Sequence, residues 1–330
     1  MRTSEGCEAQ DTAKPAERMH AIRVGLRAYA GSPMRVAVLA NPSSGRGRAK
    51  PLVESLAVLL ASRGHESFVR WVREAPLTSD DLRGCDLLVL AGGDGTVHHA
   101  LPLLIESGVA MYHLPLGTEN LLAREFGMKR AAEPLLRAMD AGRIRACDVG
   151  FAGATPFVLM CGIGPDARIV HRVAASRRGT ISHLSYIGPC LREALRPGIP
   201  RVTIECDGRE IVREERGVVV VANCRQYGFR INPAPLAGLD DGLLDVVFMP
   251  ANSSLAVIGW AARGKFGRLT RSRRWKHVQA TEAKVRWHGP EAHIQMDGEA
   301  KPSPSEGVLA FRVRPKCLRI LESARPDARA

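Results

Sequence analysis

Short apolar runs alternate with helical segments through residues 34–141. The runs are mostly apolar over five to eight residues, which is typical of strands buried in a parallel sheet. Between them, apolar side chains recur at helical spacing, as in Leu52, Leu56 and Leu60. This alternation predicts an α/β domain with a parallel sheet. The predicted strands are Met34–Ala40, His65–Val72, Asp86–Ala91 and Ala110–Leu114, and the predicted helices are a segment from Pro51 to Gly64, Val97–Glu106, a short helix through Phe126 and Ala131–Ala141.

The pattern changes after about residue 149. Short alternating or β-branched segments follow one another with Gly, Pro and Asn between them, which predicts a mainly antiparallel β-sandwich. We therefore divide the chain into a flexible extension (1–33), an α/β domain (34–148) and a β-rich domain (149–325) whose last segment can pack back on the first. The predicted elements of the β-rich domain are the strands Pro156–Cys161, Arg201–Cys206, Gly217–Ala222, Leu244–Met249, Ala283–Trp287, His293–Met296 and Val308–Val313, and the helix Ser253–Arg263.

Composition narrows the class of protein. The chain has 330 residues and no run near the ~20 apolar residues of a membrane-spanning helix. Its start lacks the apolar segment of a secretory signal. The eight cysteines are scattered, without a CxxC pair or zinc spacing, which favours reduced thiols in the cytoplasm.

The formal net charge of +13 is concentrated in one stretch. Residues 251–279 contain no Asp or Glu but seven Lys or Arg, with Trp260, Phe266 and Trp275 among them. Such a mixture fits an anionic membrane surface or nucleic acid, and equally a solvated basic face without a partner. No zinc-finger or RNP-type signature supports nucleic acid, so we expect no nucleic-acid partner.

Three loops that follow predicted strands carry the candidate chemistry. The run Leu87–Thr96 ends in three glycines around Asp94, and the loops 41–48 and 117–120 occupy equivalent places. Loops at the carboxyl ends of parallel strands share one edge of the sheet, so the three are expected to converge. A strand, a Gly-rich turn and a helix start bind phosphate, and Asp94 fits there with Mg²⁺ between carboxylate and phosphate. The loops therefore predict a nucleotide-phosphate site.

Seven motifs in order make the chain resemble the diacylglycerol kinase catalytic-domain family, which includes sphingosine and ceramide kinases and bacterial soluble lipid kinases. The resemblance extends from about Met34 to Leu321 and implies an NAD-kinase-like α/β domain that binds ATP and a β-sandwich that binds the lipid. The motifs are Asn41-Pro-Ser-Ser-Gly45, Gly92-Gly-Asp-Gly-Thr96, Pro115-Leu-Gly-Thr-Glu-Asn120, Cys161-Gly-Ile-Gly-Pro-Asp166, Asn223 with Tyr227-Gly228, Asp240-Asp-Gly-Leu-Leu-Asp245 and Asp297-Gly-Glu299.

The resemblance implies transfer of the γ-phosphate of ATP to the hydroxyl of a lipid alcohol such as diacylglycerol or a sphingoid or ceramide lipid. It implies that Glu299 is the general base with Asp297 beside it, and that Asp94 helps to hold a catalytic Mg²⁺. The implied ATP contacts are Asn41, Pro42, Ser43, Ser44, Gly45, Gly92, Gly93, Asp94, Gly95, Thr96, Val97, His98, Thr118 and Asn120.

Two acidic segments have a second interpretation. In an extended strand Asp297 and Glu299 face the same side, whereas a polar β-turn is the alternative. The resemblance implies a structural Mg²⁺ held by the Asp241 carboxylate and the carbonyls of Gly238 and Leu243. A turn before an alternating strand explains that segment equally well.

The chain also departs from the family pattern. His99 stands where the family usually has Glu, Glu119 where a small residue is common, and no threonine near Val72–Glu74 matches the family's second strand. A segment over 177–186 matches the family without an assigned role. An NAD kinase-like enzyme and a catalytically inactive nucleotide- or lipid-binding protein remain alternatives. The expected partners are a lipid alcohol, the membrane surface as a peripheral contact of a cytoplasmic protein, and a possible second copy in a homodimer.

Overall fold

The computed structural model describes residues 32–72, 74, 76–175, 187–195, 198–289 and 292–323. All but the last two residues of the predicted extension lie outside this part of the chain. The family-like segment over 177–186 also lies outside it. None of the helices within the described residues is long and apolar enough to cross a membrane.

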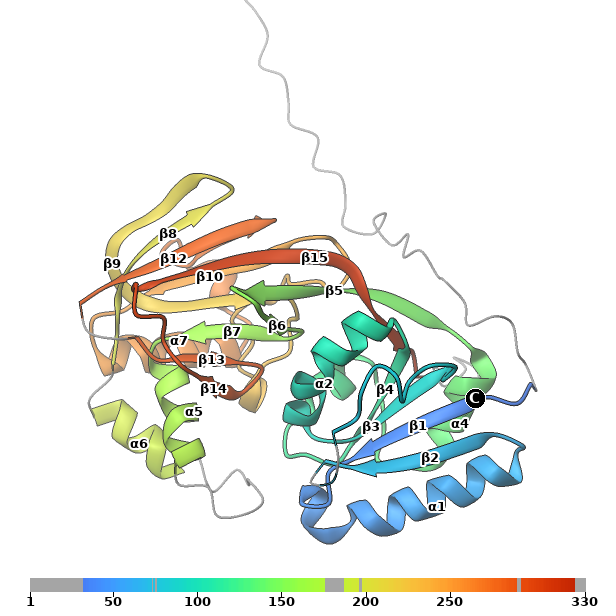
Figure 1. The fold of residues 1–330 in the computed structure, drawn as a ribbon. Helices are drawn as coiled ribbons and strands as arrows, with labels where there is room; N and C mark the ends of the chain where they lie inside the picture. The colour runs from blue at the N-terminus through green and yellow to red at the C-terminus, as the bar shows by residue number, and fades with distance from the viewer. Residues whose placement is uncertain are drawn as a thin grey trace, which may run out of the picture.

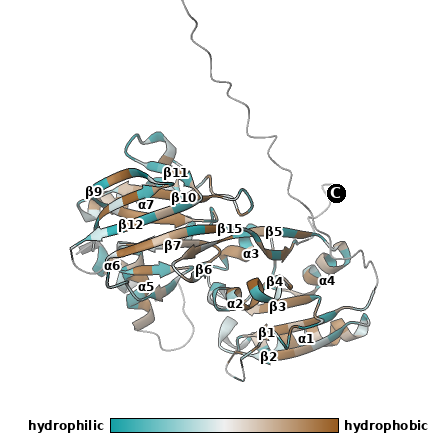
Figure 2. Cartoon of the chain, turned by 45° about the horizontal axis from the view of Figure 1, so that its top comes forward, coloured by the Kyte–Doolittle hydropathy of each residue, from teal (hydrophilic) through white to brown (hydrophobic). Residues whose placement is uncertain are grey.

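A parallel sheet in the order β2-β1-β3-β4 forms the first layer. Every side chain of β3 and β4 is buried, as their apolar sequences predict, and Figure 2 shows apolar residues along β1 and β3. Across the sheet, the chain moves from β1 to β2 in one direction and from β3 to β4 in the other. Right-handed crossovers therefore place the helices α1 and α2 on opposite faces (Figure 1). The elements are β1 (Arg35–Ala40), α1 (Ala49–Ser62), β2 (Glu66–Trp71), β3 (Leu87–Gly92), α2 (Asp94–Ser107), β4 (Ala110–Pro115), α3 (Leu121–Glu125) and α4 (Ala132–Ala141).

Helix α2 begins at Asp94, three residues before the predicted start. Gly93 is extended and ends the strand, so the helix starts directly at the acidic residue. A carboxylate in the first turn interacts favourably with the positive end of the helix dipole. The Gly-rich loop is therefore the first turn of α2.

The second domain is a β-sandwich, so the predicted fold class is confirmed. Strand β9 is long enough to pair with β8 in one sheet and with β7 and β10 in the other. The apolar core between the sheets includes Phe157, Phe248 and Phe311. The strands are β5 (Ile144–Ala152), β6 (Thr155–Phe157), β7 (Met160–Ile163), β8 (Arg201–Cys206), β9 (Arg209–Ala222), β10 (Leu244–Pro250), β11 (Lys276–Ala280), β12 (Glu282–His288), β13 (Ile294–Met296), β14 (Glu299–Lys301) and β15 (Val308–Leu321).

Three helices of this domain pack at one end of the sandwich (Figure 1). They are α5 (Pro165–Ala175), α6 (Ile187–Leu195) and α7 (Ser254–Lys265). The sequence pattern predicts only α7, whose first turn is capped by Ser253 accepting a hydrogen bond from the Ala256 N–H. The predicted strand over 156–161 is wrong as one element, because the chain breaks at Val158 and Leu159 into β6 and β7.

Strand β15 connects the two domains. It pairs antiparallel with β5 and, beyond a bulge between Arg314 and Leu318, lies parallel to β4 with Ile320 opposite Met111. The parallel sheet therefore includes residues close to the end of the described chain. Strand β5 runs across residue 148.

Candidate active site

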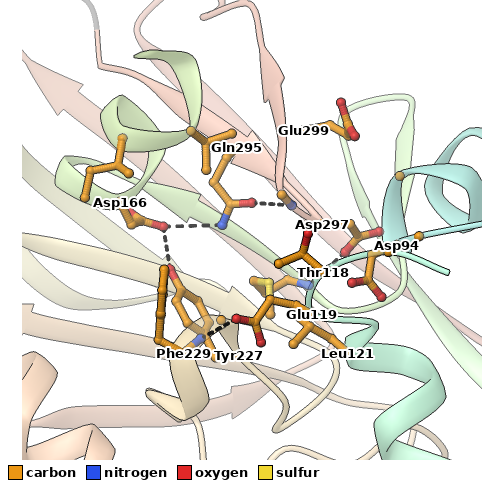
Figure 3. A pocket seen from close by; sticks show the side chains of 18 of the residues that line it. Asp94, Thr118, Glu119, Leu121, Asp166, Tyr227, Phe229, Gln295, Asp297 and Glu299 are labelled. Atoms are coloured by element: carbon orange, nitrogen blue, oxygen red, sulfur yellow. Dashed lines mark hydrogen bonds between the residues drawn. The ribbon is translucent and has the colours of Figure 1, made fainter. Parts of the chain in front are cut away.

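One cavity of about 750 Å³ lies where the two domains meet (Figure 3). Its polar end is formed by the loops that follow β1, β3 and β4, together with Asp297 and Glu299. The rest of its wall is mainly apolar. Most of it comes from the β-sandwich, α5 and α7, including Met160, Val170, Val218, Val220, Met249 and Val257, and the α/β domain adds Leu39, Leu77 and Leu103. The cavity thus has one polar and one apolar region.

Two of the loops touch through backbone alone. A Cβ on Gly117 would lie 2.6 Å from the Cα of Gly93, and one on Gly93 would lie 3.1 Å from the Cα of Gly117. Asn120 holds this approach from a left-handed conformation (φ 49°). Its Oδ1 accepts from the Gly117 N–H at 2.7 Å, and its Nδ2 donates to the Gly117 carbonyl at 2.9 Å. Only glycine at both positions allows the loops to meet.

Asp94 faces the cavity from the first turn of α2. Its Oδ1 accepts from the Leu122 N–H at 3.3 Å, which links α2 to the start of α3. Burial raises the pKa of Asp94 from 3.8 to about 6, and the negative charges of Asp297 and Glu119 contribute to the rise. An enclosed carboxylate with other carboxylates nearby is favourable when a cation neutralises it.

Asp297 and Gly298 form the turn of a tight hairpin, and this corrects the interpretation as one extended strand. Both residues have positive φ, 51° and 85°, as the favoured type I′ turn of a two-residue hairpin requires. Met296 of β13 pairs with Glu299 of β14 across the turn. Glu299 lies against the Gly-rich loop, where a Cβ on Gly95 would collide with its Oε1. The hairpin therefore brings Glu299 to the first turn of α2.

The Asp297 carboxylate anchors this hairpin. It is 4% exposed and accepts from the N–H groups of Val158, Leu159 and Met160 at 2.8–3.0 Å. Its Oδ2 also lies 3.1 Å from Nδ1 of His98 in α2. These contacts explain the break between β6 and β7, since the chain there turns its N–H groups to Asp297. The arrangement suits a positioning role for Asp297.

A second set of polar contacts supports the same hairpin from the other side. Tyr227 Oη donates to Asp166 Oδ2 at 2.8 Å, and Gln295 Nε2 donates to the same oxygen at 3.3 Å. Gln295 Oε1 then accepts from the Gly298 N–H at 2.9 Å. Burial raises the pKa of Asp166. The sequence analysis assigns no role to these residues, although Asp166 and Tyr227 stand within recognised motifs.

Glu119, unusual for its position, joins the two domains. Its Oε1 accepts from the Phe229 N–H at 3.2 Å, and its Oε2 lies 3.3 Å from Nη1 of Arg124. Arg124 in turn donates to Gln226 Oε1 at 2.7 Å and to the Tyr227 carbonyl at 2.9 Å. The loop after β4 is thereby fastened to the β domain beside the cavity.

The structure separates the sequence-predicted nucleotide contacts into two groups. Val97 is buried in the core, His98 is bonded to Asp297, and Asn120 holds Gly117, so their places in the fold are structural. His99, which replaces the usual Glu, does line the cavity. The predicted residues that line it are Asn41, Ser43, Ser44, Gly93, Asp94, Gly95, Thr96, Thr118, Asp297 and Glu299, and those that do not are Pro42, Gly45, Gly92, Val97, His98 and Asn120.

The predicted structural metal site lies on a loop outside the cavity. Asp241 Oδ1 accepts from the Leu243 N–H at 3.1 Å, and Oδ2 accepts from Gln279 Nε2 at 3.4 Å. Gly238 is adjacent, because a Cβ there would lie 3.1 Å from Asp241 Oδ2. Burial raises the pKa of Asp241, with nearby acids adding to the rise. Within the described residues no three His, Cys, Asp or Glu side chains gather as a metal site, and metal binding by this loop stays a prediction.

Two family models match most of the described chain. The diacylglycerol kinase catalytic domain matches residues 35–152. The YegS C-terminal NAD kinase beta sandwich-like domain matches residues 160–322. The matches together cover both the α/β domain and the β-sandwich.

Curated relatives match over nearly their whole length. The chain is 26% identical over 291 residues to the diacylglycerol kinase of Bacillus subtilis, covering 84% of this chain and 94% of the relative. It is 29% identical to a diacylglycerol kinase of Mycobacterium tuberculosis, covering 82% and 91%.

Solved structures share the fold at lower identity. A putative diacylglycerol kinase from Bacillus anthracis superposes with a TM-score of 0.65 at 20% identity, covering 88% of this chain and 97% of that one. Yeast NADH kinase, solved with NADH, superposes with a TM-score of 0.51 at 12% identity, covering 90% and 85%.

Proposed function

The chain is a lipid kinase of the diacylglycerol kinase family, and we propose that it transfers the γ-phosphoryl group of ATP to the hydroxyl group of a lipid alcohol. One observation carries the proposal. A single cavity joins a polar region, made by three glycine-containing loops, Asp94 and Glu299, to a longer apolar wall. A triphosphate and an acyl chain are the two ligands that such different regions accommodate.

The polar region suits ATP with Mg²⁺. Gly93, Gly95 and Gly117 line this region, and glycine backbone can approach a phosphate more closely than a residue with a side chain can. Mg²⁺ in kinases is held by one or two carboxylates together with phosphate oxygens and water, and Asp94 supplies a carboxylate that burial makes receptive to a cation. When bound, the ion neutralises charge on the phosphates during transfer.

In the proposed reaction Glu299 accepts the proton of the acceptor hydroxyl. As the hydroxyl oxygen bonds to the γ-phosphorus, the bond from that phosphorus to the bridging oxygen breaks and ADP leaves. The hydroxyl proton passes to the Glu299 carboxylate. Asp297 keeps the hairpin that carries Glu299 in place through its three backbone hydrogen bonds.

The apolar wall provides the space for the lipid. Its side chains come mainly from β7, β9 and β10 and from α5 and α7, and they line the same cavity as Glu299 and Gln295. A hydroxyl carried on an apolar chain can reach Glu299 while the chain remains against this wall. A panel of acceptors will define which acyl-chain length and which headgroup the site accepts.

Labelled ATP and Mg²⁺, incubated with diacylglycerol, a sphingoid base, ceramide or NAD, test the proposal when products are separated by thin-layer chromatography. NAD is included because yeast NADH kinase shares the fold. We expect label in a lipid product with the wild type and at least a hundredfold slower labelling with Glu299→Gln. Label in NADP alone would favour the NAD kinase-like alternative. ATP use that no acceptor stimulates would favour a binding protein without transferase activity.

A further inference from the structure

Helix α7 presents an apolar stripe to solvent. Leu255 is 81% exposed, Ile258 51% and Phe266 72%. Their spacing, together with exposed Ala262, places them along one side of the helix. The other side is fixed to the body of the domain, where Trp260 is buried and its Nε1 donates to the Pro250 carbonyl at 2.9 Å. The exposed side is therefore held rigidly towards solvent.

Neighbouring α6 packs against α7 and also carries an exposed large apolar side chain, Leu191, which is 62% exposed. Large apolar side chains gathered on one face, rather than scattered, mark a contact with a partner or a membrane.

A group of basic side chains extends along the chain from the last turn of α7 to residue 274, on either side of Phe266 in the sequence. None of them forms an ion pair with a described residue, and residues 251–279 contain no Asp or Glu to offset them. The group is Arg263, Lys265, Arg268, Arg271, Arg273 and Arg274, all exposed. The surface therefore calls for a partner with both negative charge and an apolar interior.

The same two helices form part of the cavity wall. Val257, Ile258 and Ala261 of α7 and Cys190 of α6 line the cavity, whereas Leu255 and Phe266 lie outside it. The exposed stripe therefore adjoins the apolar region of the cavity, and Ile258 belongs to both. A lipid that leaves a bilayer at this face is already beside the apolar wall.

We propose that α7 docks the protein on an anionic bilayer, with Leu255, Ile258 and Phe266 entering the interface and the basic group contacting acidic headgroups. The proposal that this face docks on a bilayer rests only on its exposed side chains and does not require the proposed activity. Delivery of the acceptor lipid to Glu299 by the same face rests on the proposed function. A nucleic acid would satisfy the basic group but would leave the apolar stripe in water.

Co-sedimentation with sucrose-loaded vesicles tests the docking face. The full chain is mixed with vesicles of phosphatidylcholine alone or with about one third phosphatidylglycerol. We expect binding to the anionic vesicles that weakens as salt rises. Arg273→Gln/Arg274→Gln is expected to weaken it about 30-fold, from about 1 kcal/mol per basic residue near the surface. Leu255→Ser/Phe266→Ser is expected to weaken it at least tenfold, because two large apolar groups no longer enter the interface.

Matched variants elsewhere provide the controls. Lys284→Gln/Arg286→Gln removes two exposed charges from β12, and Val58→Ser removes an exposed apolar side chain from α1. Both are expected to bind vesicles as the wild type does. Wild-type protein that ignores anionic vesicles, or docking variants that bind as tightly as the controls, would overturn the proposal. So would retention on DNA that depends on Arg273 and Arg274 but not on Leu255 and Phe266, if vesicles are not bound.

A short-chain, water-dispersed acceptor assayed without vesicles separates this proposal from the enzyme activity. We expect Leu255→Ser/Phe266→Ser to phosphorylate that acceptor at the wild-type rate and to lose activity only on acceptors held in anionic vesicles. Vesicle binding without any transfer would overturn the proposed function and leave docking standing. If the variant transfers phosphate as fast as the wild type to both kinds of acceptor, the proposal that this face docks on the bilayer is overturned.

Discussion

Replacing Asp94 by Asn is expected to stabilise the nucleotide-free protein while it abolishes most of the activity. Burial raises the pKa of Asp94 from 3.8 to about 6, so the ionised carboxylate is less favourable in the folded than in the unfolded chain. The folded state therefore carries a cost that is fully present above pH 6 and disappears below about pH 4. Asparagine keeps the oxygen that accepts from Leu122 but removes the charge.

The size of the gain follows from that rise in pKa. At 1.36 kcal/mol for each unit of pKa, the gain in the free energy of unfolding amounts to about 3 kcal/mol at pH 8 and about half of that at pH 5. Because the side chain is only partly enclosed, a gain of about 1.5 kcal/mol at pH 8 is the lower expectation. The rate of phosphoryl transfer is expected to fall at least a hundredfold, since a charge that stabilises the reacting phosphates is lost.

Urea unfolding at pH 8 and pH 5, without nucleotide or Mg²⁺, measures the free energy of unfolding of both proteins. Asp81→Asn serves as a control of opposite sign, because hydrogen bonds from the Thr78 N–H and Oγ1 lower the pKa of Asp81. That variant is expected to lose stability at both pH values. An Asp94→Asn protein that is no more stable at pH 8, or whose gain is the same at both pH values, would refute the reasoning from burial.

Three further substitutions separate the roles in the site. Glu299→Gln is expected to lower the rate ~10²–10⁴-fold with unchanged urea unfolding and ATP affinity by calorimetry; an unchanged rate would contradict its role as the base. Asp297→Asn is expected to lose about 2–3 kcal/mol of stability, because an amide group then faces backbone N–H donors. If this variant unfolds at the same urea concentration as the wild type, Asp297 does not anchor the hairpin. Gly117→Ala is expected to weaken ATP binding at least tenfold, since its Cβ would lie 2.6 Å from the Cα of Gly93. Gly188→Ala, whose Cβ meets nothing within 4 Å, is its control, and equal affinities in the two variants would argue against the loop contact.

The arrangement of the nucleotide loops could be predicted from sequence because it follows from topology. Strands that read as buried and parallel place their C-terminal loops at one edge, and Asp94 and Thr118 indeed line the same cavity. The prediction is less accurate within the loop. Since α2 begins at Asp94, the helical twist turns Val97 and His98 towards the core. A shift of three residues in a helix start, invisible in the pattern, decides which side chains line the cavity.

The hairpin at Asp297 shows a second limit of sequence reasoning. Asp-Gly followed by Glu is compatible with a strand and with a turn, and only the partners of Asp297 distinguish them. Those partners, at Val158 to Met160, are more than 130 residues away along the chain. The contacts of Asp166 with Tyr227 and Gln295 span 61 and 129 residues of sequence. Local patterns carry no signal for such pairings, so these residues emerge only from the folded structure.

The return of β15 to the first sheet has a consequence for folding during synthesis. Strand β4 finds its second neighbour only when residues around Ile320 are available. Until those residues have left the ribosome, the hydrogen-bonding edge of β4 remains open to other chains. The α/β domain, although made first, can therefore complete its sheet only after the whole β-sandwich has been synthesised.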